Sequence, residues 1–241
     1  MDCGSAGKSA SLISGRRWLM VNEKKKTVAV VGGGPGGYGA AFLASDLGLD
    51  VTMIDPEPNP GGVCLYRGCI PSKVLLHIVK IIRTAREADE FGLKYDEPKM
   101  DIDKMRSAKN KVVEQLTDGM GMLGKRRKIE YLRGKARFLD SNTLQIDLHE
   151  GKEEKKSFDH VILSTGSEAA SLPNINNESE RVWNSEDALN LKKVPKSLLV
   201  VGGGYIGLEL GTVYSLLGSK VTIVEMMPNI MPGLDKDLVS I

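Results

Sequence analysis

Two cysteines that lie five residues apart are the residues of this chain best suited to chemistry. Cys64 and Cys69 stand in the segment GGVCLYRGCIPSK, which ends at Lys73. A thiol pair can form and break a disulfide. The lysine four residues after the second thiol would share a helical face with it, where its charge could favour the thiolate. The spacing therefore makes redox chemistry one candidate for this segment.

The backbone between the cysteines has to depart from a regular helix if they form a disulfide. On an α-helix, residues five apart are separated by roughly 8–9 Å at Cα, whereas a disulfide tolerates about 7 Å at most. Gly68 permits unusual backbone angles, and Pro71 favours the first turn of a helix. We therefore expect a constrained, easily reduced pair just before a helix that begins near Pro71.

Two other interpretations of the thiol pair remain open at this point, namely half of a zinc site and two buried thiols. A structural zinc site needs four ligands, and the other candidate ligands do not stand at ligand spacing. These candidates are Cys3, His77, His149 and His160. We predict no metal site.

A glycine-rich motif upstream of the cysteines predicts a dinucleotide site. An apolar strand at 27–31 leads into the motif, a helix from Tyr38 to Leu47 follows, and a second strand at 51–54 ends at Asp55. Such glycines let backbone amides approach a pyrophosphate at the helix N-terminus, and the acid accepts hydrogen bonds from the ribose. The predicted binding residues are Gly32, Gly34, Pro35, Gly36, Gly37 and Asp55.

The same pattern recurs later in the chain. A strand at 197–201 is followed by a second glycine motif, a helix from about Leu208 to Leu217, and a strand at 221–224. Two motifs predict two dinucleotides, the alternative being one site and a decayed copy. The acid after the last strand can accept a hydrogen bond from a free ribose 2′-hydroxyl and would repel a 2′-phosphate, which favours NAD over NADP. The predicted binding residues are Gly202, Gly203, Gly204, Tyr205, Ile206, Gly207 and Glu225.

Together these motifs resemble those of the pyridine nucleotide–disulfide oxidoreductases, and among them the dihydrolipoyl dehydrogenases of the bacterial pyruvate-dehydrogenase type. The resemblance runs from about Lys26 to Ile241 and is carried by segments 61–73, 97–104 and 202–214. It implies an α/β fold with two Rossmann-like dinucleotide-binding units, the second truncated (the FAD/NAD(P)-binding fold). A glutathione- or mercuric-reductase-like enzyme is the alternative within the family.

The resemblance also implies a role for each motif. Cys69 would face the flavin of FAD and Cys64 would exchange with substrate, while NAD would lie on the second motif with Glu209 near the nicotinamide. Electrons would pass from dihydrolipoamide to the disulfide, then to FAD, then to NAD. The further FAD-binding residues that it implies are Gly61, Gly62, Val63, Cys64, Lys73, Ala136, Ser164, Thr165 and Gly166.

Three positions depart from the usual family pattern. Tyr66 and Arg67 replace Asn-Val between the cysteines, and we expect the charge of Arg67 to lower a thiol pKa. Ser164 replaces alanine, a change that we expect to be tolerated.

The resemblance divides the chain into three parts. Residues 1–26 would be a disordered extension, 27–170 an FAD-binding domain with the disulfide and a helical pair, and 171–241 an incomplete NAD-binding domain. Family members continue through central and dimerisation domains, and the latter supplies a His–Glu pair to which no histidine here corresponds. The implied function is a dihydrolipoyl dehydrogenase; the alternative is a truncated, catalytically impaired fragment that at most binds FAD or a partner.

Periodicity predicts the elements around the thiols. Long helices at 72–91 and 102–123 carry apolar stripes that suggest an antiparallel pair. Residues 129–163 read as short strands with a charged turn at 150–156.

Composition limits the partners. A net charge of +2 suggests no nucleic-acid or anionic-membrane partner, no apolar run reaches spanning length, and three cysteines argue against a secreted disulfide scaffold. The expected partners are dihydrolipoamide on the lipoyl domains of a 2-oxo acid dehydrogenase complex and a second copy in a homodimer. The expected location is the cytoplasm, or the mitochondrial matrix if 1–26 is a transit peptide.

Overall fold

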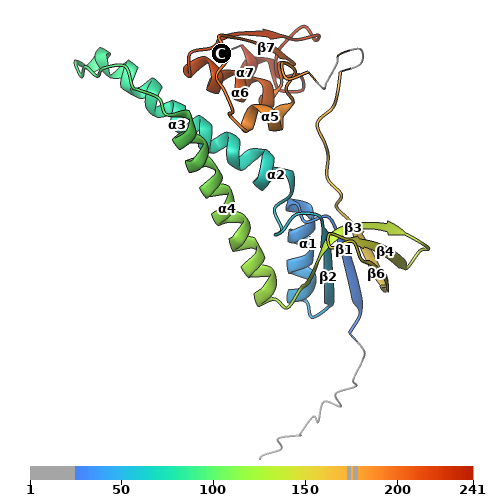
Figure 1. Ribbon diagram of the computed structural model, residues 1–241. Coiled ribbons are helices and arrows are strands. Elements are labelled where there is room, and N and C mark those ends of the chain that lie inside the picture. Colours follow the sequence, from blue (N-terminus) through green and yellow to red (C-terminus); the bar gives the residue numbers. More distant parts are fainter. Residues whose placement is uncertain (1–24, 173–174, 176–178, 241) are drawn as a thin grey trace, which may run out of the picture.

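The computed structural model describes residues 25–172, 175 and 179–240, in two βαβ units with a long helical hairpin between them (Figure 1). The extension expected at 1–26 lies outside the described residues except for its last two.

A six-stranded sheet forms the first unit, with strand order β5-β4-β3-β2-β1-β6. The strands are β1 (Thr27–Val31), β2 (Asp50–Asp55), β3 (Glu130–Phe138), β4 (Thr143–Leu148), β5 (Glu153–Ser157) and β6 (His160–Leu163). Strands β3, β2, β1 and β6 run parallel, whereas β4 and β5 continue the sheet antiparallel. The charged turn expected at 150–156 is partly wrong, because its second half lies in β5, where side chains alternate between exposed and half-buried positions.

Helix α1 (Pro35–Asp46) packs on the parallel part of this sheet. It begins three residues earlier than the sequence suggested because Pro35, with its fixed φ, occupies the first turn. Gly48, at φ +90°, ends the segment and returns the chain to β2. Alternate residues of β1 and β2 form one buried cluster with two alanines of α1, namely Val28, Val30, Val51, Met53, Ala41 and Ala44. This packing fixes the glycine motif between β1 and α1.

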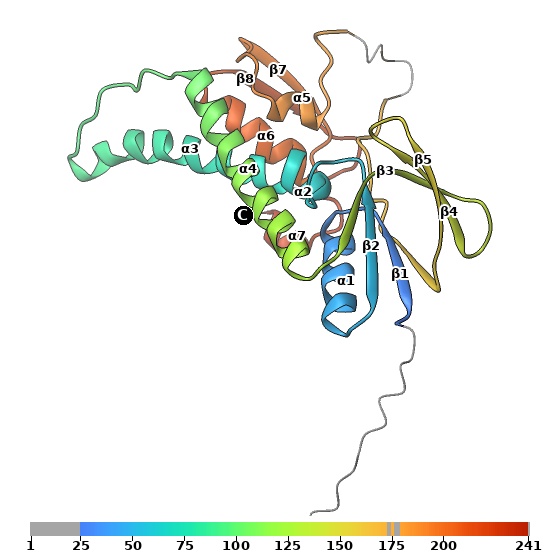
Figure 2. The same cartoon turned by 60° about the horizontal axis from the view of Figure 1, so that its bottom comes forward.

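The helical hairpin leaves the sheet after β2 and returns at β3. It consists of α2 (Gly62–Arg67), α3 (Cys69–Glu87), the 3-10 turn η1 (Ala88–Phe91) and α4 (Ile102–Arg126). Figures 1 and 2 show α3 and α4 crossing near the turn between them and diverging from there, with the turn far from the sheet, and the two helices are in contact. The expected helical pair is therefore present.

The apolar stripe of α3 faces the second unit rather than α4 alone. Leu75, Val79 and Ile82 are buried in one cluster with Leu210 and Val213. The stripe expected on α4 is weaker, since Leu116 is exposed. The buried stripe of α3 thus packs on α6, which ties the dithiol segment to the second unit.

The second unit contains a two-stranded parallel sheet. Its elements are α5 (Ser185–Leu189), β7 (Ser197–Val201), α6 (Tyr205–Leu216), β8 (Lys220–Val224) and α7 (Lys236–Val239). Both strands alternate between exposed and half-buried residues, because only one face of the sheet is covered.

One segment has the length and apolarity of a membrane span. The run Gly62–Phe91 reaches a mean hydropathy of 1.2, which differs from the expectation that no apolar run is long enough. Its helix is broken at Gly68, and its apolar stripe is buried against α6. The lack of a membrane partner stays a prediction.

Candidate functional site

The first glycine motif forms a turn that has no room for side chains. Gly32 has φ +103°, and a Cβ there would overlap the backbone carbonyl of Ser164. A Cβ at Gly37 would overlap the carbonyl of Gly32, where α1 lies closest to the end of β1. Gly34 precedes α1 without a side-chain cap. The amides at the helix N-terminus are therefore open to a phosphate group.

The acid at the end of β2 holds this turn in place. Oδ2 of Asp55 accepts a hydrogen bond from the Gly33 amide at 2.5 Å, and Oδ1 accepts one from the Glu57 amide at 2.9 Å. The carboxylate is buried, with 7% of the residue exposed. Sequence reasoning assigned Asp55 to a ribose, and the structure adds that it orients the glycine turn.

Two predicted segments meet at the first glycine motif. The amide of Gly61 donates to the carbonyl of Gly33 at 2.8 Å, and Gly62 packs directly on Gly34. On the other side, the amide of Ser164 donates to the carbonyl of Val31 at 2.8 Å. The first unit therefore gathers the predicted turns at one edge of its sheet, where α/β proteins bind ligands.

The remaining residues expected at the FAD site are spread around this edge. Thr165 and Gly166 follow Ser164 in the same turn, and Val63 is exposed in α2. Ala136 lies in β3 opposite Ile146, among the side chains of the sheet's core. Its backbone, rather than its side chain, remains available to a ligand.

The two thiols lie on either side of a break between helices. Cys64 is half-buried in α2, and Cys69 is the exposed first residue of α3. Gly68 joins the helices with φ −143° and ψ −112°, which is not helical backbone. The predicted departure from a regular helix is confirmed. Both thiols are free, and Cys69 is close enough to influence the pKa of Cys64.

Burial is the main influence on the first thiol. It raises the pKa of Cys64, and the side chain of Cys69 raises it further, while the backbone of Cys69 and the ammonium of Lys73 lower it. Arg67 is not among the main influences on this pKa; it pairs with Glu57 instead. The expectation that Arg67 lowers a thiol pKa is therefore not supported for Cys64.

Sequence reasoning missed Tyr38 as a neighbour of the thiols. Burial raises the pKa of its hydroxyl first, and the charges of Cys64 and Cys69 raise it further. Tyr38 follows the last glycine of the motif, so its position as the first residue of the predicted helix was the available signal.

A hydrogen-bonded bridge joins the dithiol segment to the second unit. Nζ of Lys73 lies 2.5 Å from Oε1 of Glu209, and the Ser72 hydroxyl donates to Oε2 at 3.1 Å. Glu209 projects from α6 and the other two from α3. The structure thus brings two predicted residues together and adds Ser72, which is buried and was not predicted.

The second glycine motif repeats the geometry of the first. Oε2 of Glu225 accepts from the Gly203 amide at 2.7 Å, and Oε1 accepts from the Met227 amide at 2.8 Å. These donors hold the pKa of Glu225 below its usual range, the Met227 amide most strongly. Gly202 has φ +108°, and Gly204 precedes α6 without a side-chain cap.

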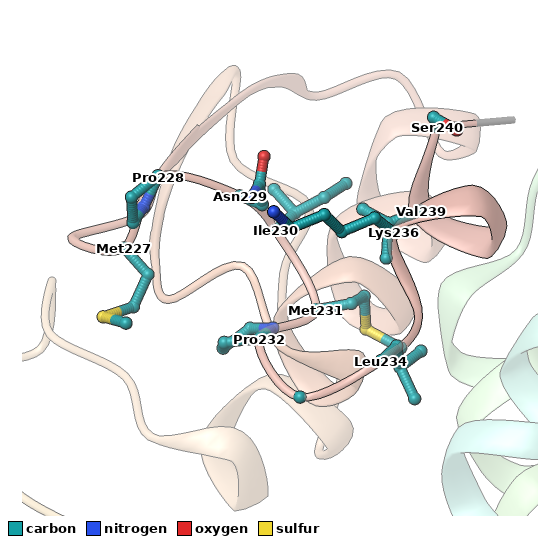
Figure 3. A pocket seen from close by; sticks show the side chains of 11 residues that line it. Met227, Pro228, Asn229, Ile230, Met231, Pro232, Leu234, Lys236, Val239 and Ser240 are labelled. Atoms are coloured by element: carbon teal, nitrogen blue, oxygen red, sulfur yellow. The ribbon is translucent and has the colours of Figure 1, made fainter.

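A hollow of 420 Å³ lies in the segment that follows β8 (Figure 3). Segment 227–240 lines it, mostly with apolar side chains, and the Met231 amide donates to the carbonyl of Gly203 at 2.8 Å. No residue of the dithiol segment lines it. Within the described ranges, no three His, Cys, Asp or Glu residues gather to hold a metal ion.

Both glycine turns suit dinucleotides. In each turn, a Cβ at the last glycine, Gly37 or Gly207, would overlap the carbonyl of the first glycine. In each, a helix of twelve residues begins without a side-chain cap, and a carboxylate accepts a hydrogen bond from the amide of the second glycine. The first turn is enclosed by neighbouring segments, and the second is open.

Comparison with known proteins agrees with these observations. The model of the family described as pyridine nucleotide-disulphide oxidoreductase matches residues 26–241. Dihydrolipoyl dehydrogenase of Vibrio cholerae is 48% identical over 222 residues, and that of Haemophilus influenzae 46%; each match covers 92% of this chain and 46% of the relative. The chain therefore spans about half the length of these curated relatives.

Solved structures give the same picture. The HOCl-induced flavoprotein disulfide reductase RclA from Escherichia coli aligns with a TM-score of 0.74 at 26% identity, covering 89% of this chain and 45% of that one. The α/β fold with Rossmann-like dinucleotide-binding units, expected from the motifs, is confirmed.

Proposed function

The chain belongs to the pyridine nucleotide-disulphide oxidoreductase family, and on that premise we propose that it carries the FAD-binding and dithiol portion of a dihydrolipoyl dehydrogenase. One observation carries this proposal. The Cys64 and Cys69 thiols lie at a helix break between two glycine turns, and Lys73 and Glu209 join that segment to the second turn's helix.

The residues of this chain would perform thiol–disulfide exchange. With Cys64 and Cys69 oxidised, a substrate dithiol would attack Cys64, form a mixed disulfide, and then close its own ring. One S–S bond forms in the substrate and one breaks in the protein, so the substrate loses two electrons and two hydrogens and the protein gains them. The attack on Cys64 releases the Cys69 thiolate, and the closure of the substrate ring releases the Cys64 thiolate. Lys73, which lowers the pKa of Cys64, would favour the second release.

The two glycine turns would hold the cofactors. FAD fits the first turn, with Asp55 behind it and the turns at 61–64 and 164–166 around it, and NAD fits the second, with Glu225 behind it. When bound, these cofactors would accept the electron pair from the dithiol and carry it away as hydride. The carboxylate of Glu225 favours NAD because it would repel a 2′-phosphate.

The partners follow from this assignment. The substrate would be dihydrolipoamide on the lipoyl domains of a 2-oxo acid dehydrogenase complex, and the whole protein would be a cytoplasmic homodimer without nucleic-acid or membrane partners. The relatives of 46–48% identity that bear the dihydrolipoyl dehydrogenase name support this choice over a glutathione- or mercuric-reductase-like enzyme.

The absorption spectrum of the purified chain, before and after anaerobic dihydrolipoamide, tests the proposal. We expect a bound-flavin band, and a long-wavelength band when the dithiol is reduced beside it. Glutathione at the same concentration is the comparison and should leave the spectrum unchanged. A flavin that responds to glutathione and not to dihydrolipoamide would favour the other reductases. A colourless chain after reconstitution with FAD would favour a fragment that does not assemble the site.

A further inference from the structure

Two of the four residues between the cysteines, Tyr66 and Arg67, are anchored outside their own helix. The hydroxyl of Tyr66 donates to the carbonyl of Asn59 at 3.0 Å and accepts from the amide of Asn59 at 3.2 Å. Asn59 is itself held, because its side-chain amide donates to Oδ1 of Asp118 in α4 at 2.9 Å. Tyr66 therefore connects α2 to the loop at 56–61 and, through it, to α4.

Arg67 makes a second anchor, in which its neighbours are carboxylates of the loop and of the second unit. Its guanidinium forms an ion pair with Glu57 in the same loop and lies 3.7 Å from Oε1 of Glu186 in α5. Glu57 is fixed by its backbone, whose amide donates to Asp55 and whose carbonyl accepts from the hydroxyl of Tyr131 at 2.9 Å. Arg67 thus links the dithiol helix to the acid of the first glycine turn and to the second unit.

We propose that Tyr66 and Arg67 are positioning residues that hold α2 so that Cys64 faces Cys69, and that they thereby set the equilibrium between dithiol and disulfide. This inference deepens the proposed function and rests on it. Neither side chain touches a reacting atom; each acts through the orientation of α2.

The reason lies in the length of α2 and in its junction. α2 has six residues, too few to be stable alone, and it meets α3 at a glycine whose backbone angles are not helical. Without outside contacts, rotation about Gly68 would separate the thiols. Contacts that hold two reacting groups together raise their effective concentration, because the entropy of bringing them together is lost before the bond forms. The anchors should therefore favour the disulfide.

Equilibration with glutathione measures the equilibrium constant between the dithiol and the disulfide of Cys64 and Cys69 directly. The full chain is incubated with defined ratios of glutathione disulfide and glutathione, and the free thiols are trapped by acid and alkylation. In the reaction, the Cys64–Cys69 bond forms, the bond of one glutathione disulfide breaks, and the two thiol protons leave on two glutathione molecules. The readout is a midpoint ratio that needs no cofactor.

The variants separate the anchors from general destabilisation. We expect Arg67→Met to lower the equilibrium constant for disulfide formation three- to tenfold, a tenfold change being about 30 mV for a two-electron couple. Glu57→Gln, which removes the same ion pair from the other side, should act in the same direction, and Tyr66→Phe about two- to threefold. Arg67→Lys should recover part of the loss because it keeps the charge.

Arg86→Met is the matched control. Arg86 pairs with Glu97 at 3.0 Å near the far end of the same hairpin, so its loss removes a similar ion pair remote from the thiols. Its midpoint should equal that of the unchanged chain. A constant that stays the same or rises in both Arg67→Met and Glu57→Gln, or that falls equally in Arg86→Met, would overturn the inference and leave the proposed function standing. An unchanged chain whose thiols never pair would overturn both.

Discussion

The two βαβ units have the same turn and different surroundings. In each, the first glycine has φ near +105°, the second donates its amide to the carboxylate after the next strand, and a glycine ends the following helix with positive φ. In the first unit, β1 lies between β2 and β6 and is almost entirely buried. In the second, β7 pairs with β8 alone, and Leu199 and Val201 are 61% and 56% exposed.

The difference separates what a local sequence determines from what neighbours determine. The glycine turn depends on residues within one βαβ segment, so it forms in both surroundings. Burial depends on strands and helices from elsewhere in the chain. In the first unit β6 and the turn at Ser164 close over the glycines, and in the second nothing within 4 Å would meet a Cβ at Gly202 or Gly204.

Alanine at the first glycine of each turn should show the largest contrast. Gly32→Ala places a Cβ at positive φ and against the backbone carbonyl of Ser164, which we expect to cost about 3–5 kcal/mol. Gly202→Ala incurs the backbone strain alone, about 1–3 kcal/mol. Urea unfolding followed by circular dichroism measures both. Equal losses would mean that the open turn is covered in solution.

Truncation of the last valine of each first strand gives the next largest contrast. Val31 is 9% exposed and Val201 56%. Val31→Ala removes two buried methyl groups, so we expect a loss of about 1.5–2.5 kcal/mol including the cavity. Val201→Ala should change stability by less than about 0.5 kcal/mol. Urea unfolding measures both losses of stability, and a large loss in Val201→Ala would contradict the exposure of β7.

Most of the fold could be predicted because its signals are local. The strands before the glycine motifs, the acids after the next strands and the two long helices all stand where periodicity and spacing predict them. The helix break between the cysteines was also predictable, because a disulfide does not fit five residues of regular helix.

The contacts that bring the site together were harder to predict from the sequence. Tyr66 and Asn59 are near in sequence, but the pairing of Ser72 with Glu209 and of Arg67 with Glu186 joins segments more than a hundred residues apart. Side chains of this kind show no period, and their partners depend on how α3 packs on α6. The apolar stripe of α3 was visible in the sequence, whereas the surface that it covers was not.

At low pH the second glycine turn should become less stable, because its stability depends on the carboxylate of Glu225. The pKa of Glu225 lies below its usual range because the Met227 and Gly203 amides donate to the carboxylate. The contribution of this carboxylate to the stability of the folded turn is therefore complete above its unfolded-state pKa of about 4.3, and it is lost as pH falls through the lower folded-state pKa. Hydrogen exchange at the Gly203 amide should accelerate, relative to the first unit, over that interval. In Glu225→Gln the same amide should show no such step, and a step that persists would contradict the assignment.

The smallest expected effect lies at the bridge where the units meet. Lys73 pairs with Glu209 and also lowers the pKa of Cys64, so the carboxylate reduces the positive potential at the thiol. Glu209→Gln keeps the shape of the side chain and removes its charge, which should lower the pKa of Cys64 and raise its thiolate fraction at neutral pH. We expect iodoacetamide to alkylate Cys64 about twofold faster. Lys73→Met should act in the opposite direction, since it removes a positive charge that lowers the pKa of this thiol. If Glu209→Gln instead slowed the reaction, the carboxylate would be acting by holding Lys73 near Cys64, and the bridge would serve the thiol through position rather than through charge.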